Sequence, residues 1–345
     1  MFTINVDDIN SILQDYEITI KCVSFSELQR YHYEKDDPTS KEVRLIIKAE
    51  LEDSRSLVIR FKNESDAPIE TIEAQSRFAA LLKAHGIQTP NAYASKGFYA
   101  RQYQINGYDV AVTVEDFVCG EIHLVNAEIA EKTGKLLARM HNIAETEDFH
   151  VQSEVLFNPL KSNDLFDFEA FAANKNKLIE IDEDLYCKIC QEHELLLQKI
   201  TAFEKDPSYA VQGDLSDCNL YMTRTGEIGV FDFNRCGDNN LYFDAVMQAL
   251  FIARLMDYPE IIAGNQEQMI LRAFLKGYHQ ERPFTERQKE VYPYLYAIIS
   301  AFWLGDMKFN NDSLENAIKE DDFSAIHHWM ETILERARLR QLMPI

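Results

Sequence analysis

Cysteine and basic side chains are both scarce in this sequence. The 345 residues include six cysteines, scattered from position 22 to position 236, which are too few and too dispersed for a disulfide framework. The 35 Lys and Arg side chains face 57 Asp and Glu side chains, giving a formal net charge of −22. That charge repels polyphosphate, so it argues against binding to nucleic acid or to an anionic membrane surface.

A long hydrophobic run is also missing. The longest strongly apolar stretch covers residues 296–304, well short of the ~20 residues that a membrane-spanning helix needs. The first residues are acidic, whereas a leader peptide needs basic residues followed by an apolar segment. We therefore expect a protein of the reducing cytoplasm, with no membrane partner.

The chain shows no internal repeat, no low-complexity tract and no long Gly/Ser linker, which favours two lobes joined by a short hinge. Apolar alternation in the first third predicts strands, and one segment has helical spacing. The predicted strands are residues 18–25, 43–51, 56–62, 98–104 and 109–117, and the helix is 69–85. Beyond Gly120 the pattern is mostly helical, at 127–144, 168–178, 183–203, 241–256, 266–278, 286–308 and 323–342.

These patterns predict an α+β fold of two lobes, a small antiparallel sheet lobe with one helix (residues 1–116) and a larger, mainly helical lobe (residues 117–345). Charge is shared unequally between them. Residues 1–115 contain 18 acidic and 13 basic side chains, whereas residues 116–345 contain 39 and 22. Most of the negative charge is therefore expected on the helical lobe.

One segment of the second lobe, residues 209–233, interrupts the helical pattern with short apolar strands around a Thr-Arg-Thr-Gly turn. This is a hairpin signal. A hairpin returns its ends to the same place, so Asn219 and Asp232 are predicted to lie side by side. An amide oxygen and a carboxylate are ligands that suit Mg²⁺ when water and phosphate fill its other positions.

Asp214 precedes Asn219 by five residues, on the loop that enters the hairpin. At that position its carboxylate can orient an attacking hydroxyl. The order Asp-x-x-x-x-Asn, hairpin, Asp is the layout of phosphoryl transfer, in which one Asp accepts the proton of the nucleophile while Asn and Asp hold the metal. We therefore predict that Asp214 is catalytic and that Asn219 and Asp232 are metal ligands.

The order Gln212-Gly213-Asp214, Asn219, Asp232 and Asp244 resembles the pattern of the aminoglycoside phosphotransferase family and its relatives, the choline and homoserine kinases, which have a protein-kinase-like fold. Residues 133–141 and 273–278 are similar to two helices of the family's large lobe, and the resemblance runs from about residue 18 to about residue 278. We expect Asp244 to brace the structure, because it lies near the start of an apolar helix.

The resemblance also implies roles in the small lobe. Arg60 occupies the strand that usually carries the phosphate-contacting lysine, and Glu73 occupies the place of the helix glutamate that pairs with that cation. Lys62 lies on the same face of the strand by its period of two, so it is the alternative phosphate contact. Backbone groups of the hinge, from Glu115 through Phe117 to residue 118, are implied to hold the adenine.

Three residues or segments depart from the family pattern. Arg60 replaces a lysine, although a guanidinium can also bridge phosphate and carboxylate. Gln212 replaces a histidine, and because an amide both donates and accepts hydrogen bonds we expect it to support the loop equally well. The connection between the first two strands, residues 24–37, lacks glycine, so its backbone amides are expected to grip phosphates less closely.

The sequence thus predicts a small-molecule kinase that uses ATP or GTP with Mg²⁺ and phosphorylates a hydroxyl group. Aminoglycosides, amino alcohols, homoserine and sugars all remain open as acceptors, and the acidity of the helical lobe slightly favours a cationic or neutral one. Oligomeric state stays open. The alternative, suggested by the three departures, is a catalytically silent protein that binds a nucleotide or another ligand with the same fold.

Overall fold

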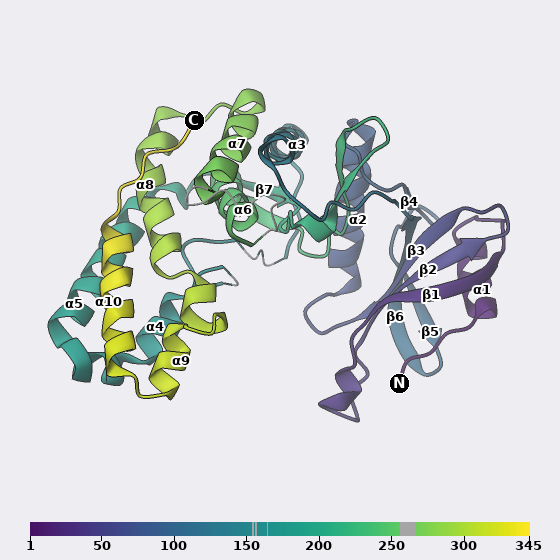
Figure 1. The fold of residues 1–345 in the computed structure, drawn as a ribbon. Coiled ribbons are helices and arrows are strands. Elements are labelled where there is room, and N and C mark those ends of the chain that lie inside the picture. Colours follow the sequence, from purple (N-terminus) through teal and green to yellow (C-terminus); the bar gives the residue numbers. More distant parts are fainter. Residues whose placement is uncertain (154, 156, 164, 256–265) are drawn as a thin grey trace.

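The computed structural model describes residues 1–345 apart from 154, 156, 164 and 256–265. The strands of the main sheet, with α1 and α2, lie on one side of the molecule, and the later helices lie on the other (Figure 1). The predicted α+β class, with an antiparallel sheet followed by helices, is confirmed. The division into residues 1–116 and 117–345 stays a prediction, although the main sheet ends at Asp116.

The main sheet has the strand order β1-β2-β3-β6-β4, and β5 also pairs with β6. All of these pairs are antiparallel. The strands are β1 (Cys22–Arg30), β2 (Val43–Leu51), β3 (Ser56–Asn63), β4 (Ala92–Tyr93), β5 (Arg101–Ile105) and β6 (Tyr108–Asp116). Because side chains alternate along a strand, β3 and β6 present an apolar face and a face with charged side chains.

The apolar face of the sheet is covered by α1 (Val6–Asp15), a helix that the sequence interpretation missed. Its buried residues Ile9, Ile12 and Leu13 follow helical spacing, and Asn5 with Asp8 forms a capping box. Those two signals mark a helix start. The strand predicted over residues 18–25 is therefore wrong at its beginning, since β1 starts at Cys22 and continues to Arg30.

The other face of the sheet lies toward α2 (Ile69–Ala84), which agrees with the predicted helix. Ile72, Gln75, Phe78 and Leu82 form its buried stripe. The helix ends at His85, followed by Gly86 with a positive φ of 84°, a backbone conformation that glycine adopts freely.

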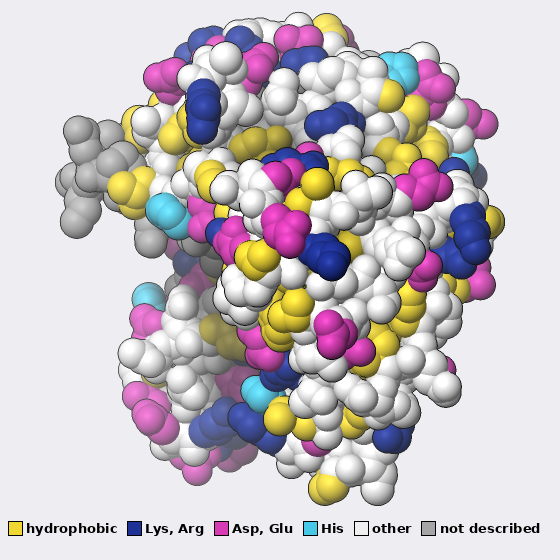
Figure 2. Space-filling view, turned by 90° about the vertical axis from the view of Figure 1, so that its right-hand side faces the viewer, with side chains coloured by type: hydrophobic (Ala, Val, Ile, Leu, Met, Phe, Trp, Pro, Cys, Tyr) yellow, Lys and Arg dark blue, Asp and Glu magenta, His cyan; other side chains and the backbone are white. Residues whose placement is uncertain are grey.

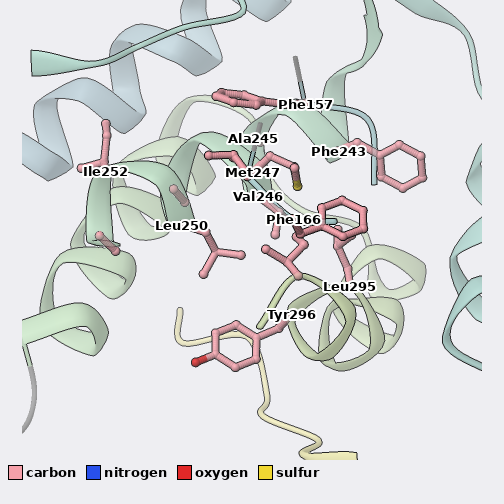
Figure 3. Close-up of a cluster of buried hydrophobic side chains, with 14 of the residues drawn as sticks. Phe157, Phe166, Phe243, Ala245, Val246, Met247, Leu250, Ile252, Leu295 and Tyr296 are labelled. Carbon is pink, nitrogen blue, oxygen red and sulfur yellow. The ribbon is translucent and has the colours of Figure 1, made fainter. Parts of the chain in front are cut away.

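The second part of the chain packs its helices around a large apolar cluster, part of which is drawn in Figure 3. The helices are α3 (Ala127–Thr146), α4 (Phe168–Ala173), α5 (Lys175–Ile200), α6 (Leu241–Leu255), α7 (Gln266–Glu281), α8 (Glu286–Ala301), α9 (Leu314–Lys319) and α10 (Phe323–Arg338). A break at Asp182 in α5 lies between the two helices predicted there. Helix α8 ends at Ala301, before the predicted 308, and a π-helical turn (Gly305–Phe309) follows.

Short strands β7 (Ser208–Val211), β8 (Leu220–Met222), β9 (Ile228–Val230) and β10 (Gly237–Asn240) lie where the helical pattern is interrupted. The chain that follows β6 is hydrogen-bonded to β8. The Met222 amide donates to Gly120 O at 2.7 Å, and the Ile122 amide donates to Leu220 O at 3.2 Å. On the other side, the Val230 amide donates to Gln88 O, just after α2, at 2.9 Å. The β8–β9 hairpin is therefore bonded to both the connection and the small lobe.

Lys and Arg side chains are interspersed with Asp and Glu side chains on the face seen in Figure 2, with no large block of one sign. No helix in the described part of the chain combines the length and the apolar character that crossing a bilayer requires.

Helices α3 and α7 pack with their backbones in close contact through two glycines. A Cβ at Gly134 would lie 2.0 Å from Phe274 O, and a Cβ at Gly277 would lie 2.0 Å from Glu131 O. Neither position can accept a methyl group without separating the helices.

We expect Gly134→Ala to destabilise the protein by about 1–3 kcal/mol or more. In an ordinary helix the same change stabilises the protein by about 1 kcal/mol. The sign of the change in unfolding free energy therefore distinguishes close helix packing from an ordinary helix position. Urea unfolding provides the measurement, with Arg139→Ala, an exposed change on the same helix, as the control. Equal or higher stability of Gly134→Ala would contradict the close helix packing.

Candidate active site

The predicted β8–β9 hairpin is confirmed, with Leu220 opposite Val230 and Met222 opposite Ile228. Its two ends are joined by a hydrogen bond from the Phe231 amide to Asn219 O at 3.0 Å. Asn219 and Asp232 therefore flank the same end of the hairpin, as the sequence predicts.

The loop before the hairpin places Asp214 against Asn219. The Asn219 side-chain amide donates from Nδ2 to Asp214 O at 2.9 Å and to Asp214 Oδ2 at 3.1 Å. Because Nδ2 is turned toward Asp214, Oδ1 of Asn219 is directed elsewhere. Asn219 thus orients the Asp214 carboxylate, while its own Oδ1 accepts a long bond from Cys218 Sγ at 3.9 Å that a metal ion could replace.

Gln212 is fully buried and supports this loop from behind. Its Oε1 accepts from the Asp214 amide at 2.8 Å, and its Nε2 donates to Asp232 O at 2.7 Å. One side chain therefore fixes the backbone of both acidic residues. The expectation that glutamine would support the loop in place of histidine is confirmed.

Two backbone conformations shape the same region. Gly213 has a φ of 85°, and a Cβ there would lie 2.2 Å from Arg235 O, so only glycine fits. Asp232 also has a positive φ, 56°, which is costly for a residue with a side chain and is typical of functional sites. The carbonyl bond from Gln212 helps to hold Asp232 in this conformation.

Burial raises the pKa of the Asp214 carboxyl above its ordinary range, and the Asp232 carboxylate raises it further. The positive charge of Arg235 and the bond from Asn219 act in the opposite direction. Two carboxylates thus lie close enough to repel each other. A raised pKa suits a group that must accept a proton, because it increases basicity.

Arg60 and Lys62 lie on the same face of β3, as predicted, and both line the cleft between the sheet, α2 and Asp232. Arg60 forms an ion pair with Glu115 of β6. Burial lowers the pKa of Arg60, but the negative charges of Glu115 and Asp232 outweigh that effect and raise it. The Nε of Arg60 is buried without a hydrogen-bond partner.

The predicted pairing of Glu73 with the β3 cation is wrong. Glu73 accepts bonds from the amides of Tyr99 and Ala100, both at 2.7 Å, and forms an ion pair with Arg77. The α2 residues that line the cleft are Ile72, Gln75, Ser76 and Ala79, and Glu73 is not among them. The Glu115 side chain is the acidic partner of Arg60, whereas its predicted backbone contact with the nucleotide stays a prediction.

Gln75 is the cleft residue of α2 that the sequence interpretation missed. It is 6% exposed and donates from Nε2 to Asn234 O at 3.1 Å and to Cys236 O at 3.0 Å. It therefore ties α2 to the segment that follows Asp232. Its place on the apolar stripe of α2, spaced by three from Ile72 and Phe78, was the signal that could have identified it.

Lys62 is held by Glu64, whose Oε2 lies 3.3 Å from the lysine Nζ. Glu64 also accepts from Arg44 and from the Tyr33 hydroxyl. Burial lowers the pKa of Lys62, although Glu64 raises it. Since Tyr33 lies between β1 and β2, this buried carboxylate fixes a connection that has no glycine.

The hinge amides are less available than predicted. The Phe117 amide donates to Ser56 O at 3.0 Å and the Asp116 amide to Asn91 O at 2.9 Å. The prediction that backbone groups of this hinge hold a nucleotide base stays a prediction, and in this conformation these two amides are already bonded within the protein.

Asp244 has the structural role expected for it. It is fully buried at the start of α6, where its Oδ2 lies 3.0 Å from Nε2 of His141 on α3. Burial lowers the pKa of His141 although Asp244 raises it. Nδ1 of His141 lies 2.8 Å from the Tyr278 hydroxyl of α7, so a buried polar network joins three helices.

The acidic end of the hairpin fits a magnesium ion by its chemistry. Asn219 and Asp232 supply hard oxygen ligands, and the repulsion that raises the pKa of Asp214 is what a cation would relieve. In the described part of the chain no three Asp, Glu, His or Cys side chains converge on one point. Two protein ligands suit Mg²⁺, which usually keeps water and phosphate in its remaining positions.

The model of the phosphotransferase enzyme family, APH, matches residues 47–284, more than half of the chain. The matched region includes β3, α2, the hinge and all of the proposed catalytic residues. The chain also matches an uncharacterized protein of Deinococcus radiodurans with 24% identity over 139 residues. That alignment covers 39% of each protein, so the chain spans about two fifths of this relative.

Solved structures share the fold at low sequence identity. An aminopropanol kinase associated with a microcompartment is 16% identical with a TM-score of 0.58, covering 97% of this chain and 99% of the other. Amicoumacin kinase, solved with AMP-PNP, Ca²⁺ and amicoumacin, is 18% identical with a TM-score of 0.54, covering 85% and 86%. A spectinomycin phosphotransferase with ADP and spectinomycin is 13% identical with a TM-score of 0.51, covering 97% and 98%.

We expect Gln212→Leu to reduce turnover strongly while the protein still folds, because the Asp214 amide and the Asp232 carbonyl lose their shared partner. Each buried unpaired group costs about 1–3 kcal/mol, so the unfolding free energy should also fall. Steady-state kinetics and urea unfolding provide the measurements. Gln102→Leu, on an exposed strand position, is the control.

Gln212→His should restore most of the lost activity, because imidazole can accept from one group and donate to the other. Full activity in Gln212→Leu would contradict the supporting role of this side chain.

Proposed function

The chain belongs to the phosphotransferase enzyme family, and from this membership we propose that it transfers the terminal phosphoryl group of ATP or GTP to a hydroxyl of a small molecule. The observation that carries the proposal is the arrangement at the hairpin. Asn219 bonds directly to Asp214, Asp232 lies at the other end of the hairpin, and Arg60 faces Asp232 across the cleft.

Asp214 is the proposed base. Its carboxylate is half-buried, oriented by Asn219 and fixed at its own amide by Gln212. In the reaction it would accept the proton of the acceptor hydroxyl as the oxygen attacks the terminal phosphorus. Because the pKa of Asp214 is raised, turnover should decline as the pH falls through that raised value.

Asn219 and Asp232 are the proposed magnesium ligands, through Oδ1 of the amide and the carboxylate. When bound, the ion would neutralise charge on the phosphate oxygens. The backbone of Asp232 is held by Gln212 and its Oδ1 accepts from the Asn234 amide at 3.2 Å. These bonds leave the second carboxylate oxygen for the ion.

Arg60 is the proposed phosphate contact, since it faces Asp232, whereas Lys62 is drawn toward Glu64. The cleft that these cations line encloses about 50 Å³, below the ~300 Å³ at the lower end of small-molecule pockets. We infer that nucleotide entry is accompanied by separation of the sheet and the hairpin. The phosphates would then replace Glu115 as partners of Arg60.

The acceptor is proposed only as a class, a small molecule with a free hydroxyl. The acidity of the helical lobe supports a cationic or neutral acceptor, as inferred from the sequence.

We expect Asp214→Asn to lower turnover by roughly 10²–10⁴-fold, the range of general-base catalysis, with nucleotide affinity nearly unchanged. The melting temperature should rise. The folded state holds the Asp214 proton more tightly than the unfolded chain does, so ionised Asp214 destabilises the fold as the pH rises through the raised pKa.

Phosphoryl transfer to a panel of hydroxyl compounds, titration with AMP-PNP and a thermal melt are the three measurements. Asp148→Asn, an exposed change, is the control. Wild-type turnover in Asp214→Asn would remove the catalytic assignment. If the wild-type chain binds nucleotide but turns over no acceptor and no water, the silent alternative is favoured.

A second set of variants distinguishes the small-lobe residues. We expect Arg60→Met to weaken AMP-PNP binding by about tenfold or more, because a charge-assisted bond to phosphate is lost. Glu73→Gln should change the affinity less than about twofold, since Glu73 bonds away from the cleft. A large loss in Lys62→Met with none in Arg60→Met would instead identify Lys62 as the phosphate contact.

A further inference from the structure

A second pocket, distinct from the interlobe cleft, lies among the ends of α6, α7, α8 and α10 in the helical lobe. It encloses about 570 Å³, within the ~300–1,000 Å³ range of small-molecule sites. Its polar lining includes two arginines, Arg254 and Arg336. Its apolar wall includes Tyr296 and Trp303, both largely buried. In Figure 3 the Tyr296 hydroxyl is directed away from the apolar cluster.

Arg254 is held in place from several sides. Its Nη2 donates to Ser300 Oγ at 2.8 Å and to Glu267 Oε1 at 3.1 Å. Its guanidinium lies 4.7 Å from the centre of the Trp303 ring and 5.7 Å from that of Tyr296. The side chain is 12% exposed. An arginine fixed by stacking and by bonds to one nitrogen is preorganised to bind through its other N–H groups.

Arg336 reaches the same serine from α10. Its Nη1 bonds to Asp306 Oδ2 and donates to the Ser300 carbonyl at 3.4 Å. Since Ser300 takes a bond from Arg254 through Oγ and from Arg336 through its carbonyl, the two guanidinium groups are neighbours. Bringing two cations together is unfavourable unless negative charge is supplied.

Two carboxylates, Glu267 beside Arg254 and Asp306 beside Arg336, supply that charge, but each also bonds to a neighbour of its own. Glu267 Oε1 also accepts from the Tyr296 hydroxyl at 2.9 Å, and Asp306 Oδ1 accepts from Asn310 Nδ2 at 3.0 Å. Among the residues that the structure describes, each arginine is bonded through a single terminal nitrogen, so its remaining N–H groups can serve a ligand. The complementary partner of such a planar fork is a carboxylate or a phosphate.

We propose that this pocket binds the carboxylate group of a small molecule, with Arg254 and Arg336 as the anion-binding residues. A carboxylate is favoured over a phosphate, because the pocket with its two acids is neutral and a doubly charged phosphate would be repelled by Glu267 and Asp306. Tyr296 and Trp303 provide the surface for the carbon skeleton. This inference goes beyond phosphoryl transfer and does not depend on it.

The pocket is connected to the active site through α6. Oε1 of Gln248 in this helix accepts a hydrogen bond from the amide of Leu215, the residue after Asp214, at 3.1 Å. Arg254 follows six residues later, about 9 Å along the helix axis. A ligand bound at Arg254 therefore contacts the helix that also supports the catalytic loop.

The test uses two pairs of compounds that differ in a carboxylate, gluconate with glucitol and glycerate with glycerol. Calorimetric titration of the full chain without nucleotide keeps the result independent of phosphoryl transfer. We expect at least one acid to bind about tenfold or more tightly than its neutral counterpart, the effect of a charge-assisted pair. Arg254→Met and Arg336→Gln should each remove that preference, whereas Arg139→Met, an exposed arginine of α3, should retain it.

Arg336→Gln serves as the second variant because its side chain is 35% exposed, so it should fold even if Arg254→Met does not. Equal binding of acids and neutral compounds, no binding of either acid, or an unchanged preference in Arg336→Gln would each overturn the proposal. Inorganic phosphate is the competing anion, and tighter binding of phosphate than of both acids would overturn the carboxylate assignment.

Discussion

The candidate active site depends on one buried amide, the side chain of Gln212. It accepts from the Asp214 amide and donates to the Asp232 carbonyl, and it has no access to solvent. A buried group that satisfies two backbone positions at once also fixes their separation, because either bond would be expensive to lose. The two Gln212 bonds lie next to the two unusual backbone positions, Asp232 with its positive φ and Gly213, where only glycine fits. They help to hold the backbone in these conformations.

The charged side chains in the cleft are also paired with one another. Arg60 and Lys62, which both line the cleft, each have a carboxylate beside them, Glu115 and Glu64. Buried cations need such partners in the absence of a ligand. The carboxylates therefore stabilise the unliganded protein, and the same bonds set the free energy that a polyphosphate must supply when it displaces them.

Local patterns in the sequence were sufficient to predict the β8–β9 hairpin and to place Arg60 and Lys62 on the same face of a strand. Turn chemistry determines which residues close a hairpin, and a strand has a fixed period of two, so neither depends on distant parts of the chain. The support by Gln212 could also be foreseen, because amide and imidazole have similar hydrogen-bonding capacity.

The contacts that local patterns could not predict are those whose partners come from elsewhere in the fold. Glu73 and Gln75 are two positions apart, and only the rotation of α2 against the segment after Asp232 decides which of them faces the cleft. Phe117 has its amide bonded to Ser56, a contact set by the pairing of β3 with β6. Helix α1 carried a capping signal, but its short length made the pattern easy to miss.

The connection between the lobes has a mechanical consequence. Gly120 and Ile122 are bonded to the β8 strand, so they move with the catalytic hairpin rather than with the sheet. The freely rotating part of the hinge is then reduced to the few residues between Asp116 and Gly120. Two further connections join α2 and the residues just after it to the hairpin segment, the Gln75 bonds to Asn234 O and Cys236 O and the bond from the Val230 amide to Gln88 O. Opening of the cleft should therefore be a rotation about a short axis at the hinge, which these bonds oppose.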